Sequence, residues 1–78
     1  NPSTGDFAIH YTLLEEAQVQ AIVYNTLGEQ VAASELSLQA AGQGFMSFDA
    51  STWSTGIYVV RFMQNGVLKA TEKLIVRH

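Results

Sequence analysis

Residues that could carry catalysis or bind a metal are sparse in this chain. The two histidines, His10 and His78, are far apart, and neither has a Cys, Asp or Glu at the spacing of a metal-ligand pair. His10 falls on the polar side of an alternating segment, where a solvated imidazole is the ordinary state, and His78 is terminal and expected to be mobile. Cysteine is absent, which excludes thiolate chemistry and disulfides. We therefore expect no metal site and no cofactor.

The carboxylates and glycines do not form a catalytic pattern either. Glu15 and Glu16 are the only adjacent acidic residues, and neighbours in a turn do not converge on a substrate as an acid–base pair must. Gly42 and Gly44 precede a predicted strand, whereas a phosphate-binding loop precedes a helix. The sequence predicts that the chain is not an enzyme.

Composition narrows the class of protein further. The 78 residues carry a net charge of −3 with only four Lys and Arg, so a nucleic-acid surface, which needs clustered cations, is not expected. No apolar run approaches the roughly 20 residues of a membrane span. The opening residues, Asn1 to Gly5, resemble a linker. We interpret residues 1–78 as one domain and a fragment of a longer secreted protein.

Alternating apolar and polar residues predict strands along nearly the whole chain. A helix over Glu29–Ala41 is the main competitor, but its apolar residues do not repeat at the i, i+3, i+4 spacing of a helix. Gln18–Asn25 is apolar on both faces, which indicates a central strand. The predicted strands are residues 7–13, 18–25, 30–34, 35–39, 45–48, 57–63 and 67–77.

Glycine-containing turns separate these strands. Asn65-Gly66 lies between the last two and is typical of a type I′ hairpin turn, so the chain should end in an antiparallel hairpin. Gly28 should have a positive φ, and Gly56 either a positive φ or a close backbone approach. The fold class predicted is all-β: a single Ig-like antiparallel β-sandwich of about seven short strands, without the Cys–Trp–Cys core of true immunoglobulin domains.

Two groups of side chains allow both a structural and a functional interpretation. A cluster of Trp53, Tyr58, Phe45 and Phe48 could be a sugar-binding platform. We favour the structural alternative, in which Trp53 caps one end of the sandwich and Tyr58 packs beneath it with its hydroxyl bonded to the backbone. The cations, all on the last two strands, form either a recognition strip or edge protection against strand addition. They are Arg61, Lys69, Lys73 and Arg77.

Four blocks of sequence then support a more specific interpretation. They are Asn1-Pro2, residues 23–28 with Val31 after them, residues 56–61, and residues 73–77. In this order and spacing they resemble the C-terminal sorting domain of cargo proteins of the type IX (Por) secretion system of Bacteroidetes. Trp53 stands where members often have Leu, and Ala21 where a larger aliphatic residue is common.

The resemblance implies a C-terminal secretion signal that directs an attached cargo across the outer membrane. Its implied partners are the outer-membrane type IX translocon and a sortase-like cysteine protease, which usually removes the domain upstream of Asn1. The cargo passes through the periplasm to the cell surface, where it is anchored to anionic lipopolysaccharide or released. By position, the implied recognition residues are Gly56, Tyr58, Arg61, Lys73, Leu74, Ile75, Val76 and Arg77.

A second hypothesis is an Ig- or fibronectin-like module of a surface enzyme that binds carbohydrate or protein, with Trp53 in contact with the ligand. A sorting domain must end its reading frame, whereas a binding module need not. Under either hypothesis, an exposed final strand favours dimers of the isolated domain.

Overall fold

The computed structural model describes residues 2–3 and 5–78. In this part of the chain the regular secondary structure is β-strand, and there is no helix. Each predicted strand is present, with its ends moved by a few residues. None of the described residues lies in a helix that could cross a membrane. The strands are β1 (Pro2–Ser3), β2 (Asp6–Leu13), β3 (Ala17–Asn25), β4 (Gln30–Ala33), β5 (Ser37–Gln39), β6 (Gly42–Asp49), β7 (Gly56–Gln64) and β8 (Val67–Val76).

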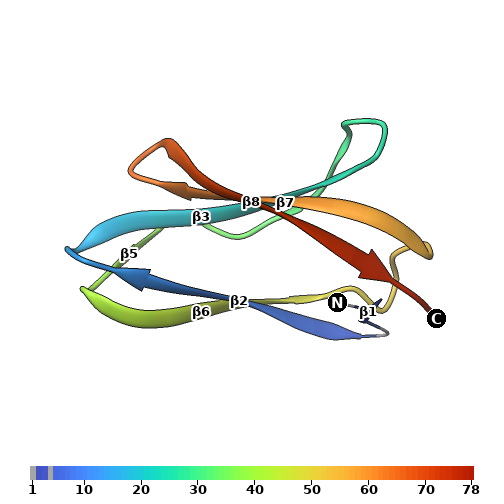
Figure 1. Cartoon of the computed structure of the whole chain (residues 1–78), viewed down its shortest axis with the longest axis horizontal. Helices are drawn as coiled ribbons and strands as arrows, with labels where there is room; N and C mark the ends of the chain where they lie inside the picture. The colour runs from blue at the N-terminus through green and yellow to red at the C-terminus, as the bar shows by residue number, and fades with distance from the viewer. Residues whose placement is uncertain (1, 4) are drawn as a thin grey trace.

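The strands form two layers, which Figure 1 shows one above the other. The larger sheet has the order β1-β8-β7-β3-β4, with β5 also paired to β3, and the smaller sheet is the antiparallel pair β2-β6. This arrangement confirms the predicted all-β, Ig-like sandwich. Because β2 and β6 cover only part of the larger sheet, its edge strand β8 stays largely uncovered.

β3 is central, as its two apolar faces predicted. β7 pairs along one edge of β3, while β4 and β5 share the other. Between β4 and β5, Ser34 continues the pairing: its N–H donates to the carbonyl of Ala21 at 2.9 Å, and its Oγ accepts from the Ala21 N–H at 2.9 Å. The backbone of β3 therefore keeps partners where the two short strands meet.

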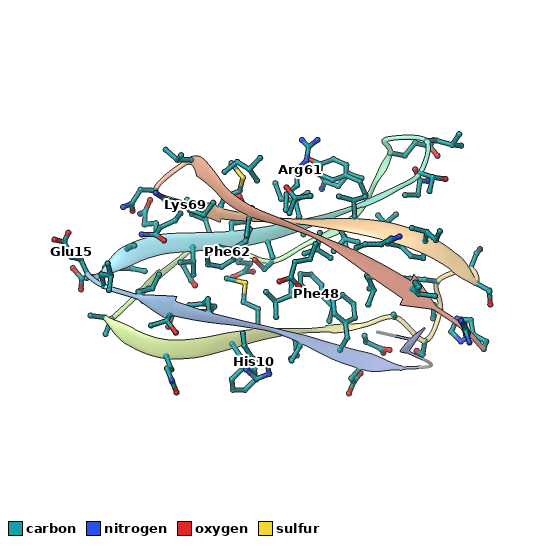
Figure 2. All side chains as sticks on the ribbon, in the orientation of Figure 1. His10, Glu15, Phe48, Arg61, Phe62 and Lys69 are labelled. Atoms are coloured by element: carbon teal, nitrogen blue, oxygen red, sulfur yellow. The ribbon has the colours of Figure 1, made fainter. Side chains whose placement is uncertain are left out.

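The core lies between the two sheets and is built from the side chains of each strand that point inward. β3 contributes Val19, Ala21 and Val23, all fully buried. Figure 2 shows Phe48 and Phe62 between the layers, and His10 on the outer side of the smaller sheet. Two clusters of buried residues result: Ala21, Val23, Ala50, Tyr58, Val60, Leu74 and Val76 in one, and Leu13, Ala17, Val19 and Phe62 in the other.

The predicted C-terminal hairpin is confirmed. Asn65 and Gly66 have φ values of 51° and 77°, the positive angles that a type I′ turn requires. The turn is also tied to β3, since Asn65 donates from its N–H to the carbonyl of Gln18 at 2.8 Å and accepts from the Gln18 N–H through Oδ1 at 2.9 Å. A register shift at Phe62/Met63 interrupts the hairpin near its turn.

Two expectations about non-strand segments were wrong. Pro2–Ser3, interpreted as linker, forms a strand that pairs in parallel with Ile75 and Val76 of β8; proline is tolerated there because β1 is an edge strand. Residues 42–44, expected in a turn, belong to β6 and pair with residues 11–13 of β2. The prediction for Asn1 and Thr4 concerns residues outside the described part of the chain.

Candidate recognition surface

The two blocks predicted for recognition lie side by side, one on each strand of the β7–β8 hairpin. The register pairs Gly56 with Val76 and Tyr58 with Leu74. Residues that are separated in the sequence therefore form one continuous part of the sheet. Antiparallel pairing also places the two blocks at the same end of the hairpin, away from its turn.

The hairpin divides these residues between its two faces. Tyr58, Leu74 and Val76 are buried against the core, whereas Arg61, Lys73 and Arg77 are exposed. Gly56 and Ile75 are half-buried. A partner that binds the folded domain reaches the cations, while the buried members support the strands that carry them.

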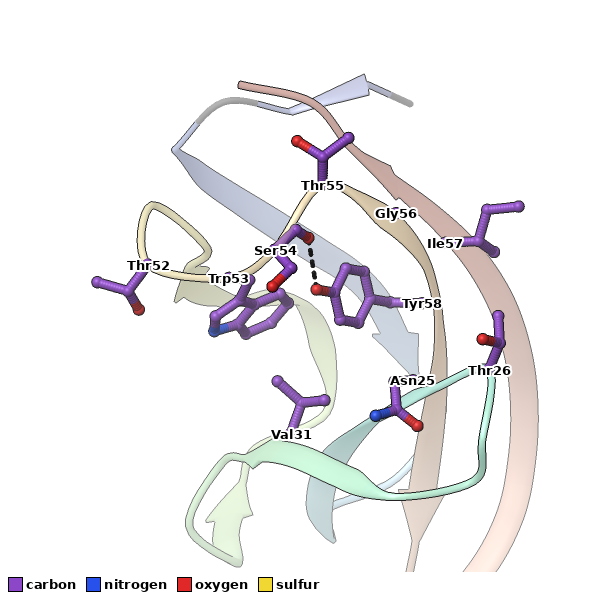
Figure 3. Close-up of a pocket in the computed structure, with 10 residues that line it drawn as sticks. All are labelled: Asn25, Thr26, Val31, Thr52, Trp53, Ser54, Thr55, Gly56, Ile57 and Tyr58. Atoms are coloured by element: carbon purple, nitrogen blue, oxygen red, sulfur yellow. Dashed lines mark hydrogen bonds between the residues drawn. The ribbon is translucent and has the colours of Figure 1, made fainter.

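Tyr58 and Trp53 pack as the structural interpretation predicted. The Tyr58 hydroxyl donates a hydrogen bond to the carbonyl of Ser54 at 2.6 Å (Figure 3). The Trp53 ring lies 5.2 Å from the Tyr58 ring and meets Phe7 edge-on at 5.7 Å, centroid to centroid. Trp53 thus closes one end of the sandwich, and aromatic pairs of this kind add to the energy of area burial.

The four aromatics of the alternative sugar platform do not share one surface. Phe48 stacks on Phe7 at 5.4 Å inside the sandwich, and Phe45 is 64% exposed beside His10 on the smaller sheet. Trp53 does border an open hollow of about 430 Å³ at the end of the sandwich (Figure 3). The hollow is lined by Asn25, Thr26, Val31, Thr52, Trp53, Ser54, Thr55, Gly56, Ile57 and Tyr58.

His78, expected to be mobile as a terminal residue, makes a contact with the backbone. Its Nε2 is 2.5 Å from the carbonyl oxygen of Trp53, a contact in which the ring N–H donates. The partner is 25 residues away in the sequence, so no local pattern could have predicted it. The His78 side chain therefore meets the turn that carries Trp53.

Gly56 does not have the special backbone that we expected. Its φ is not positive, and a Cβ added there would meet no heavy atom within 4 Å. The close approach occurs instead at Gly44, where an added Cβ would lie 2.5 Å from the Tyr11 hydroxyl oxygen. Gly44 faces Tyr11 directly across β2 and β6, so the ring occupies the space that a side chain would need.

The cations do not form a single cluster. Arg61 lies over the Tyr24 ring, with 5.0 Å from Cζ to the ring centroid, and the register places Thr71 opposite it. Lys69 sits at the register shift near the hairpin turn, and Lys73 is opposite Val59. Lys69 and Lys73 are exposed on the edge strand β8, a position that suits both a recognition strip and protection against strand addition. Arg61 differs from them because the Tyr24 ring defines its orientation.

Hydrogen bonds from the hydroxyl and then the N–H of Ser51 lower the pKa of the Asp49 carboxyl at the end of β6. Within the described residues, no three His, Asp or Glu side chains gather as metal ligands would. The arrangement on the hairpin is suited to binding through shape, backbone and single charges.

A comparison with known protein families identifies the family of this domain. Residues 1–77 match the family model described as the secretion system C-terminal sorting domain. The chain belongs to that family. It is a type IX C-terminal sorting signal, a non-catalytic domain that interacts with the secretion machinery and marks its protein for the cell surface or the extracellular space. No curated protein and no solved structure matches the chain.

In this sorting domain, β8 presents an open edge. In the part of the chain that the structure describes, β1 pairs with β8 only at Ile75 and Val76, and every residue from Val67 to Lys73 is exposed. An uncovered edge strand offers unpaired backbone N–H and carbonyl groups to another chain. The backbone of β8 is therefore open to pairing along most of its length.

Sequence analysis assigned no recognition role to the loop between β3 and β4. Its Asn25 and Gly28 indicated only a turn, and the predicted positive φ of Gly28 is confirmed at 84°. The structure adds that Leu27, at the tip of this loop, is 83% exposed. The sequence shows a leucine within a glycine-containing turn, but only the geometry of the loop shows that this side chain is exposed.

Proposed function

We propose that the outer-membrane translocon recognises this domain on the β7–β8 hairpin and that a sortase-like protease then removes it from its cargo. The domain would be the last part of a longer secreted protein, which passes through the periplasm and is then anchored to lipopolysaccharide or released. The observation that carries this proposal is the position of β8. The final strand is at the edge of the larger sheet and is exposed from Val67 to Lys73.

Two modes of contact fit this strand. A partner can add a strand to the open edge, where main-chain hydrogen bonds supply affinity, or it can pair its carboxylates with Lys73 and Arg77. Both modes are compatible with the fold because neither needs a buried residue to move. The carbohydrate-binding alternative has weaker support, since Trp53 is engaged by Phe7 and Tyr58.

A reporter fusion tests the proposal. We expect residues 1–78, fused to the C-terminus of a neutral periplasmic protein, to send that protein to the surface of a type IX-competent cell. Deleting 74–78 should abolish export, but the deletion also removes Leu74 and Val76 from the core, at about 1.5–3 kcal/mol each. The deletion alone therefore cannot separate recognition from stability.

A charge variant separates the two effects. Replacing Lys73 and Arg77 with Gln removes exposed charges, which should change stability by no more than about 0.5 kcal/mol, while reporter accumulates in the periplasm. The matched control replaces Glu15 and Glu16, exposed in the turn between β2 and β3, with Gln. Normal export of the Lys73/Arg77 variant would show that these cations are not read.

A further inference from the structure

The loop between β3 and β4 is ordered by one side chain. Asn25 Oδ1 accepts hydrogen bonds from the N–H groups of Leu27 and Glu29, both at 3.0 Å, and its Nδ2 donates to Glu29 Oε1 at 2.9 Å. The backbone adds Asn25 N–H to the Glu29 carbonyl at 3.0 Å and Gly28 N–H to the Asn25 carbonyl at 3.1 Å. The loop is therefore fixed before any partner arrives, which reduces the entropy lost on binding.

This fixed loop presents an apolar side chain to solvent. Leu27 is 83% exposed at its tip. One exposed leucine is ordinary on a protein surface, and Leu14, 94% exposed in the turn between β2 and β3, is another. What distinguishes Leu27 is its setting, because the loop that carries it also forms the wall of a hollow.

The hollow lies against the outer face of the larger sheet and measures about 380 Å³. Figure 2 shows Arg61 on this outer face, the side toward which the β3–β4 loop rises in Figure 1. The Tyr24 ring holds the Arg61 guanidinium in position, and the strand neighbours of Arg61 are Ile22 and Thr71, which supply no carboxylate. The lining residues are Tyr24, Asn25, Thr26, Gly28, Val59 and Arg61.

We propose that the loop Asn25–Glu29 and Arg61 form a docking surface for one protein segment of the secretion machinery. That segment presents a carboxylate, which pairs with Arg61 in the hollow, beside an apolar recess that receives Leu27. This inference rests on the proposed function. It joins the β3–β4 loop, to which sequence analysis gave no role, to Arg61 on β7, one of the predicted recognition residues.

The charge of this hollow favours a protein segment over a polyanion as its binding partner. A polyanion such as a nucleic acid or an anionic glycolipid layer needs several clustered cations, whereas this hollow has one and the chain has a net charge of −3. A single guanidinium set over an aromatic ring suits one carboxylate, to which it can bond in a bidentate manner. Arginine is enriched among the residues that dominate interface energetics, and the exposed leucine next to it adds apolar area that a partner can bury.

The test uses the full 78-residue domain on the reporter, in single variants. Leu27→Ser and Arg61→Glu should each lower surface export about tenfold or more, as expected for loss of an anchor residue, with an unchanged melting curve. Leu14→Ser is the matched control for Leu27, and Gln43→Glu, which adds a negative charge at an exposed position of β6 in the smaller sheet, is the control for the charge introduced at Arg61. Both controls should be exported at the wild-type level.

The outcomes separate this inference from the proposed function. If the wild-type fusion is not exported, the proposed function fails and the docking surface with it. If the wild type is exported and Leu27→Ser and Arg61→Glu are too, only the docking surface is wrong. Equal loss in Leu14→Ser and Leu27→Ser would also overturn it. Should Leu27→Ser melt at a lower temperature, Leu27→Gln, which keeps the side-chain length, must still lose export.

Discussion

Replacing Gly44 with alanine should destabilise the domain through one aromatic ring. A Cβ at Gly44 would lie 2.5, 2.6 and 2.8 Å from the Oη, Cζ and Cε1 atoms of Tyr11. Carbon atoms in contact are about 3.5–4.0 Å apart, so the ring must move by roughly 1 Å. It cannot do so freely, because Tyr11 is stacked on Phe62 at 5.2 Å with 27° between the ring planes.

Overpacking of this kind costs about 1–3 kcal/mol. A loss of about 2 kcal/mol corresponds to a fall of roughly 12 °C in the melting temperature of a domain this size. The measurement is thermal and urea unfolding of residues 1–78, followed by circular dichroism. Gly56→Ala is the control: an added Cβ there meets nothing within 4 Å, and the smaller entropy of the unfolded chain should make the change neutral or stabilising by up to about 1 kcal/mol.

A double-mutant cycle with Tyr11→Ala tests whether the Tyr11 ring causes the loss of stability. In a Tyr11→Ala background the clash is absent, so Gly44→Ala should cost much less than in the wild type, and the difference is the coupling energy of a double-mutant cycle. If Gly44→Ala melts with the wild type, or costs the same with and without the Tyr11 ring, the reasoning from the ring contact is refuted.

Two further substitutions probe the end of the sandwich. Tyr58→Phe removes the part-buried hydrogen bond to the Ser54 carbonyl and should cost about 1 kcal/mol. The cost is read from urea titrations by the fluorescence of the single tryptophan, Trp53, and an unchanged midpoint would contradict this. Asp49 has a lowered pKa in the folded state, so its contribution is present above the unfolded-state pKa and is lost as the pH falls through the folded-state value. Asp49→Asn should therefore melt at a lower temperature than the wild type at neutral pH and at the same temperature in acid. A difference that persists in acid would show that the ionised Asp49 carboxylate is not its cause.

Local chemistry explains what could be predicted from the sequence. Asn65-Gly66 requires two positive φ angles that few other dipeptides supply, and the hairpin follows from it. The bond from Tyr58 to Ser54 spans four residues, so it too lies within reach of a local argument. Strand positions follow from the period of two, since one face of each sheet must be buried.

Contacts between distant residues explain what could not be predicted. Pro2 and Ser3 have no periodicity of their own, and their partners, Ile75 and Val76, are at the opposite end of the sequence. The close approach at Gly44 depends on Tyr11, which the register of β2 and β6 brings opposite it. Gly56 looked special because of its place before a strand, but a glycine's neighbours in sequence do not show whether its backbone is strained.

The parallel pairing of β1 with the end of β8 has a mechanical consequence. With a cargo joined ahead of β1 and a machine that grips the chain after Val76, tension pulls these two strands past each other along their shared direction. Such a load is a shear, which stretches the hydrogen bonds between the strands together rather than one after another. Among the described residues, Pro2 and Ser3 alone share that load with Ile75 and Val76, so β1 would detach first. Pulling would then uncover the remaining edge of β8 while the sandwich stays folded.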